Sequence, residues 1–106
     1  MSTNYYFRES LGVGGTQETH LGKRSVGWPF LFHSFHEVDS FAQLVGFLEN
    51  TPGEVVNEYG DTLNPVEFVI MASNWGYGKP AIENRRPMRM ARADSEGYWF
   101  VDLEFC

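Results

Sequence analysis

Residues 40–53 read SFAQLVGFLENTPG, and this stretch decides the fold of the 106-residue chain. Ser40 followed three residues later by Gln43 is a capping box, which begins a helix. Apolar residues then recur at helical spacing and form one stripe: Phe41, Leu44, Val45 and Leu48. Because Thr51-Pro52-Gly53 stops a helix, we predict one amphipathic helix between these signals.

Residues 64–70 read NPVEFVI and repeat the same kind of start signal. Asn64 is suited to the N-cap, Pro65 to the first helical position and Glu67 to the third. Val66, Val69 and Ile70 are expected to supply the buried stripe of this second helix. It should end between residues 73 and 76, where the glycine-rich loop 75–80 begins.

The segments around the two helices alternate apolar and polar residues as strands do. Turn signals separate them, including Gly60-Asp61 and residues 94–97. The expected strands are residues 4–8, 16–24, 29–36, 54–59, 88–91 and 99–105. In the last of these, Trp99 and Val101 should face the core and Phe100 the solvent. We predict an α+β fold, in which an antiparallel sheet of five to six strands packs against two short helices.

The second and third strands should form a hairpin around Val26-Gly27. A loop centred on these two residues pairs positions whose numbers sum to 53. It places His20 opposite His33 and Leu21 opposite Phe32.

Length and composition indicate one soluble domain, residues 1–106, with 42% hydrophobic residues. The single cysteine, Cys106, excludes an intrachain disulfide and a cysteine-based zinc site. The N-terminal residues MSTNYYFRES lack the pattern of a secretion signal, and the chain has no run of 18 apolar residues. We therefore expect a cytoplasmic protein that does not bind membranes.

Two sequence motifs that bind nucleotides in many enzymes are incomplete in this chain. Gly22-Lys23 lacks the upstream glycine and the following Ser or Thr of a phosphate-binding loop. The glycines of residues 12–15 lack the third glycine and the helix of a dinucleotide-binding fold. We expect a protein without a cofactor, more in keeping with a binding module than with an enzyme.

Three residues of the predicted hairpin could bind a metal ion. Glu18, His20 and His33 share one face in the expected pairing, and two imidazoles with a carboxylate suit zinc. A metal-dependent hydrolase or nuclease is therefore an alternative function. The other interpretation is that both histidines form hydrogen bonds locally on the sheet.

The net charge of −6 is unevenly distributed. Residues 79–92 contain five basic residues and one acid, a charge of +4, which leaves −10 on the rest of the chain. The basic strip and the nearby aromatic loop are candidate binding residues: Trp75, Tyr77, Lys79, Arg85, Arg86, Arg89 and Arg92. The arginines could bind a nucleotide or nucleic acid, or form a solvated edge strand. The acidic remainder could face a basic protein or keep the chain soluble.

Four blocks of sequence together resemble a family of small bacteriophage and prophage proteins that has no assigned activity. They are NYYFR at residues 4–8, ETHLGKRSVGW at 18–28, EYG at 58–60 with PVEF at 65–68, and EGYWF at 96–100 with EF at 104–105. Members often carry a cysteine cluster after the first strand, which residues 9–16 lack here. Within the matched blocks, His20, Lys23 and Trp28 are further candidate binding residues.

This resemblance implies a phage-encoded accessory protein in the cytoplasm of the host bacterium. Small acidic proteins of this kind commonly act by binding. The expected partner is a host enzyme or an anti-phage defence complex, which the protein would inhibit in the manner of an anti-CRISPR protein.

Overall fold

A computed structural model describes residues 2–10, 15–25, 30–35, 37–74 and 90–102. In these residues seven strands form one sheet in the order β5-β4-β1-β2-β3-β7-β6. The strands are β1 Ser2–Ser10, β2 Thr16–Ser25, β3 Leu31–His33, β4 Glu54–Asn57, β5 Thr62–Leu63, β6 Arg92–Ala93 and β7 Trp99–Val101. The helices are α1 Phe41–Asn50 and α2 Pro65–Asn74. The α+β class is confirmed, with slightly more strands than predicted.

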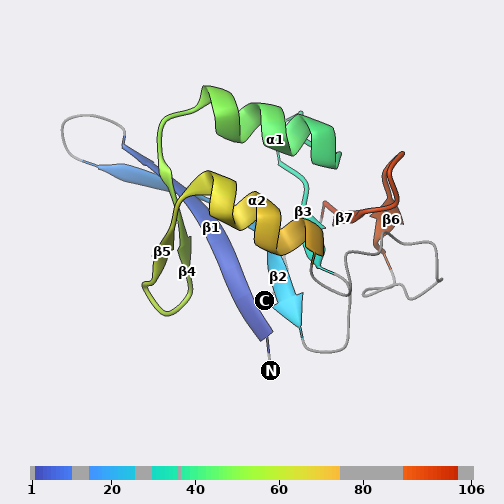
Figure 1. Cartoon of the computed structure of the whole chain (residues 1–106), viewed down its shortest axis with the longest axis horizontal. Coiled ribbons are helices and arrows are strands. Elements are labelled where there is room, and N and C mark those ends of the chain that lie inside the picture. Colours follow the sequence, from blue (N-terminus) through green and yellow to red (C-terminus); the bar gives the residue numbers. More distant parts are fainter. Residues whose placement is uncertain (1, 11–14, 26–29, 36, 75–89, 103–106) are drawn as a thin grey trace.

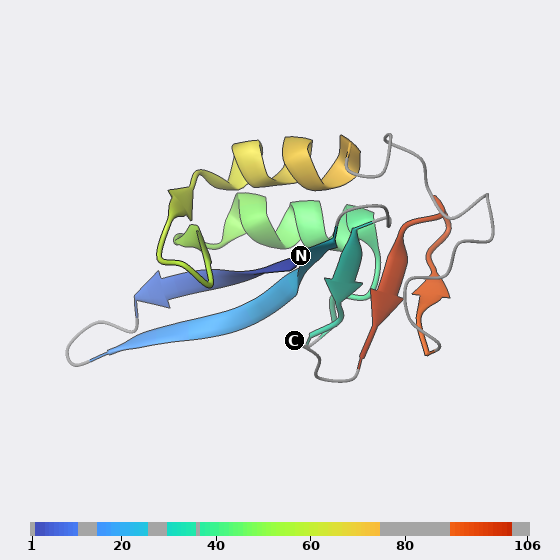
Figure 2. The same ribbon diagram turned by 90° about the horizontal axis from the view of Figure 1, so that it is seen from below.

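Both helices lie on one face of the sheet and run antiparallel to each other (Figures 1 and 2). The main core fills the space between the helices and the sheet, and much of it is aromatic. It includes Phe7, Leu21, Phe32 and Phe100 from the strands, and Leu44, Leu48, Phe68 and Ala72 from the helices. The sheet and both helices therefore share one apolar layer.

The start signals of both helices form as predicted. Ser40 Oγ accepts a hydrogen bond from the Gln43 amide at 3.3 Å, and Gln43 Oε1 accepts one from the Asp39 amide at 2.9 Å. In α2, Asn64 Oδ1 accepts from the amides of Val66 and Glu67, and Glu67 Oε1 accepts from the Asn64 amide at 3.1 Å. These bonds satisfy amide groups that a helix start leaves without partners.

The prediction of the buried face of α2 was wrong at two positions. Val66 and Ile70 are 65% and 57% exposed, whereas Phe68 and Ala72 are buried. The Phe68 ring lies 5.6 Å from the ring of Tyr5 and 5.7 Å from that of Phe30. Because this large side chain takes the space between helix and sheet, α2 turns Val66 and Ile70 toward the solvent.

The hairpin between β2 and β3 is confirmed, but its predicted register was wrong by one residue. Gly22 pairs with Phe32 and Lys23 with Leu31. The shifted register goes with a β-bulge in β2. On the other side of β2, Tyr5 of β1 pairs with Gly22 and Tyr6 pairs with His20, so Leu21 is an extra residue without a partner in β1. At Gly22, a Cβ atom would clash with Leu31 O and with the Phe30 ring. This register therefore requires glycine.

The last described strand also differs from the prediction. β7 pairs parallel with β3 and antiparallel with β6, so it is an interior strand, and the sheet is mixed rather than wholly antiparallel as predicted. Phe100, predicted to face the solvent, is buried and stacks on Phe32 at 5.0 Å. Trp99 and Val101 face the other way and pack with Leu31 and Ala91. An interior strand is commonly buried on both faces, which the alternating pattern did not indicate.

Two glycine substitutions test the bulge. We expect Gly22→Ala to lower the free energy of unfolding by about 1–3 kcal/mol, because a methyl group has no space there. Gly46→Ala is the matched control: its added methyl group meets nothing within 4 Å, and alanine favours the helix by about 0.5–1 kcal/mol. Urea denaturation of both variants measures the two effects. Equal stability of the Gly22→Ala variant and the native protein would contradict the register.

Candidate functional site

Most of the predicted aromatic and basic binding residues lie outside the described part of the chain. These are Trp28, Trp75, Tyr77, Lys79, Arg85, Arg86 and Arg89. Their proposed role in binding therefore stays a prediction. Arg92, His20 and Lys23 are the candidates that the structure places.

Arg92 lies exposed on β6 and lines a polar cavity of about 370 Å³ at the start of α1. The hydroxyl groups of Ser34, Ser40 and Ser95 share this cavity, and so do two carboxylates, Asp39 and Asp94. Asp94 has a structural role, since its Oδ2 accepts a hydrogen bond from the Phe41 amide at 2.7 Å. The cavity therefore combines one guanidinium group with two carboxylates.

His20 and His33 are buried side by side on the face of the sheet opposite the helices. Each is 8% exposed, and their ring centroids are 5.1 Å apart at an interplanar angle of 28°. Tyr6 stacks on the other side of His20 at 5.0 Å. The predicted proximity of the two histidines is thus confirmed, although the strand register that was used to infer it was wrong.

The hydrogen bonds around His20 determine its tautomer. Glu58 Oε1 lies 3.1 Å from Asn4 Nδ2 and 2.6 Å from the Asn4 amide nitrogen. Because a carboxylate only accepts, Asn4 directs its Nδ2 toward Glu58 and its Oδ1 toward His20. His20 Nε2, 2.9 Å from that oxygen, is therefore the donor. We infer that one chain of hydrogen bonds joins His20, Asn4 and Glu58.

Glu18, the third residue of the predicted metal site, is exposed and pairs in register with Arg8 on β1. Together with His20 and His33 it does not form a group that could bind a metal ion, and the described residues contain no other such group of three. The stacked rings place their faces, not their nitrogen atoms, toward each other. Lys23, also on β2, is half-buried opposite Asn4.

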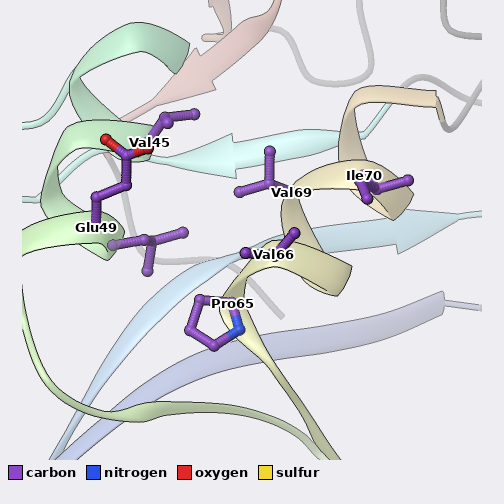
Figure 3. A pocket seen from close by; sticks show the side chains of 7 residues that line it. Val45, Glu49, Pro65, Val66, Val69 and Ile70 are labelled. Carbon is purple, nitrogen blue, oxygen red and sulfur yellow. The ribbon is translucent and has the colours of Figure 1, made fainter.

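The sequence interpretation missed a groove between α1 and α2, which has a volume of about 200 Å³. Figure 3 shows Val45 and Glu49 on its α1 side and Pro65, Val66, Val69 and Ile70 on its α2 side. Leu48 completes the lining. A signal was present in the sequence: residues 65–72 include seven apolar residues, too many for one buried face.

The segment that carries this groove is acidic throughout. Residues 30–74, which supply both helices and the β4–β5 hairpin, contain seven acids and no lysine or arginine. All seven acids are exposed: Glu37, Asp39, Glu49, Glu54, Glu58, Asp61 and Glu67. Val66 and Ile70 are thus exposed apolar side chains on helices that carry two acids, Glu49 and Glu67, and no lysine or arginine.

No described helix has the length and apolar character to cross a lipid bilayer.

Asn4→Ala tests the hydrogen-bond chain. We expect it to lower the free energy of unfolding by about 1–3 kcal/mol, because it removes the partner of a buried imidazole donor. Arg8→Ala, which breaks an exposed ion pair between β1 and β4, should cost about 0–1 kcal/mol. Denaturant titration gives both values, and imidazole ¹⁵N shifts should report the Nε2–H tautomer of His20. An Nδ1–H tautomer would contradict the assignment.

No family model matches this chain, no curated protein does, and no solved structure does. We therefore derive a function from the contacts, burial and charge of the described residues.

Proposed function

We propose that this chain is a non-enzymatic accessory protein that acts by binding a basic protein through the α1–α2 face. One observation carries the proposal: Val66 and Ile70 are 65% and 57% exposed, in a segment, residues 30–74, with seven acids and no lysine or arginine. Exposed apolar residues beside a groove are typical of protein-binding surfaces. The surrounding acids favour a partner of opposite charge and speed its association.

The sequence resemblance to small phage and prophage proteins supports a biological setting. In that setting the protein is made in the cytoplasm of an infected bacterium, where it inhibits a host enzyme or an anti-phage defence complex. Enzymes and complexes that bind nucleic acids carry the basic surfaces that an acidic protein can occupy. To block such a surface, the protein needs to bind it and does not need to catalyse a reaction.

The alternative of a metal-dependent hydrolase has less support. His20 Nε2 is already hydrogen-bonded to Asn4, and the rings of His20 and His33 stack on each other. Both groups therefore contribute to the packing of the sheet.

Affinity capture tests the proposed function. Native protein, a Val66→Lys/Ile70→Lys variant and a Met90→Lys control are immobilised and exposed to bacterial lysate. Met90 is 60% exposed and does not line the groove. Its replacement by lysine therefore adds positive charge at a similarly exposed position outside the groove. We expect the native protein and the control to capture the same basic protein, and the groove variant to lose it.

Two further results must agree with the proposal. The captured protein should elute as salt concentration rises, because opposite charges attract it. If it is an enzyme, its activity should fall when native protein is added and stay unchanged with the groove variant. Equal capture by the native protein and the groove variant, or no capture by the native protein, would overturn the function.

A second candidate function is the binding of a small anionic ligand, and the cavity beside Arg92 favours it. Among the described residues Arg92 forms no ion pair, and three serine hydroxyl groups share its cavity. A guanidinium group with hydroxyl donors suits phosphate. Asp39 and Asp94 line the same cavity and would repel a polyanion, so a mononucleotide fits better than a nucleic acid strand.

Thermal denaturation with AMP at low and high salt tests this second function. A ligand that binds the folded state raises the melting temperature, and binding to phosphate weakens with salt. We expect the shift to disappear in an Arg92→Ala variant and to persist in an Arg8→Ala control. The absence of a shift in the native protein, or an equal shift in the Arg92→Ala variant, would exclude this function.

A further inference from the structure

The walls of the α1–α2 groove are two ridges of helical side chains. Val45 and Glu49 are four residues apart on α1, and Val66 and Ile70 are four residues apart on α2. Leu48 and Val69 also line the groove and are less exposed than Ile70. Side chains four residues apart form the ridges that pack into grooves of a neighbouring helix. The groove therefore has the shape that receives a third helix.

The backbone around the groove favours a helix over a strand. α1 and α2 satisfy their own backbone groups, so this face presents no strand edge to which an extended peptide could add. A helix also satisfies its own backbone and offers only side chains to the groove. The residues that line the groove span 45–49 on α1 and 65–70 on α2, and each of these helices has ten residues, about 15 Å, the length of roughly three helical turns.

A second copy of this chain does not suit the groove. Two copies that met through this face would bring together helices that carry acids, Glu49 on α1 and Glu67 on α2, and no lysine or arginine. Glu49 would lie within such an interface, because it lines the groove itself. Charges of the same sign placed in this way oppose association.

The same charges suit a basic partner. Lysine or arginine beside the apolar stripe of a helix would face Glu49, which lines the groove. Val66 and Ile70 would contact the stripe itself, and burying them removes apolar surface from water. Shape and charge thus indicate the same kind of occupant.

We propose that the α1–α2 groove binds an amphipathic helix of the partner, apolar along one stripe and flanked by lysine and arginine. This inference rests on the proposed protein-binding function and specifies the structural element that is recognised. Val66 and Ile70 are the apolar contacts, and Glu49 selects for positive charge.

Three synthetic peptides test the helical occupant. The first has about 16 residues, enough for a marginally stable helix, with leucine at positions i, i+3, i+4 and i+7 and lysine at most others. The second has the same composition in an order that removes the stripe. The third keeps the leucine pattern and replaces lysine with glutamate. Fluorescence anisotropy measures their affinities, and amide shifts in ¹H–¹⁵N spectra locate the contact.

We expect the first peptide to bind and to shift amides of α1 and α2. The second should bind at least about tenfold more weakly, and the third should not bind. Val66→Lys/Ile70→Lys should weaken the first peptide by about tenfold or more, and Met90→Lys should leave it unchanged. Equal binding of the first two peptides would overturn the proposal, because charge would then suffice.

The peptide and capture experiments distinguish failure of the helical occupant from failure of the proposed cellular function. If lysate capture depends on Val66 and Ile70 but the first peptide does not bind, the helical occupant is wrong and the protein-binding function stands. If the first peptide binds as expected but the lysate yields no partner, the groove recognises a helix and the proposed cellular function is wrong.

Discussion

One extra residue in β2, Leu21, determines which side chains of the central strands face the helices. The bulge lets both Leu21 and Gly22 lie toward the core, while His20 turns to the opposite face. Gly22 then allows the backbone of Leu31 and Phe32 to approach closely. This approach places Phe32 against Phe100 of β7, so the bulge influences the packing of strands distant in sequence.

The same bulge creates the polar face of the sheet. His20 stacks between Tyr6 and His33, and its hydrogen bond to Asn4 continues to Glu58, directly after β4. These contacts join the β4–β5 hairpin to the central strands. α2 follows this hairpin directly in the chain. His20 and His33, two of the three residues of the predicted metal site, thus pack within the sheet and link its strands.

Local signals allowed part of the fold to be predicted, and long-range contacts decided the rest. The caps at Ser40 and Asn64 act within four residues, so the sequence was sufficient to locate both helix starts. The register of β2 with β3 depends on the bulge and on space around Gly22, which no local pattern contains. The parallel pairing of β3 with β7 joins segments more than 60 residues apart, and alternation within one strand carries no information about it.

The candidate groove emerged from a prediction that failed. Val66 and Ile70 have the spacing of a buried stripe, but Phe68 and Ala72, one turn apart on the same helix, form the packed face instead. Burying an aliphatic side chain of this size contributes about 1.5–3 kcal/mol, so leaving two of them exposed forgoes stability that the fold could have gained. Exposed acids lie on the same two helices, Glu49 on α1 and Glu67 on α2, and surface acids of this kind favour solubility. Apolar residues that the core does not use, in an acidic layer, are understandable if a basic partner covers them.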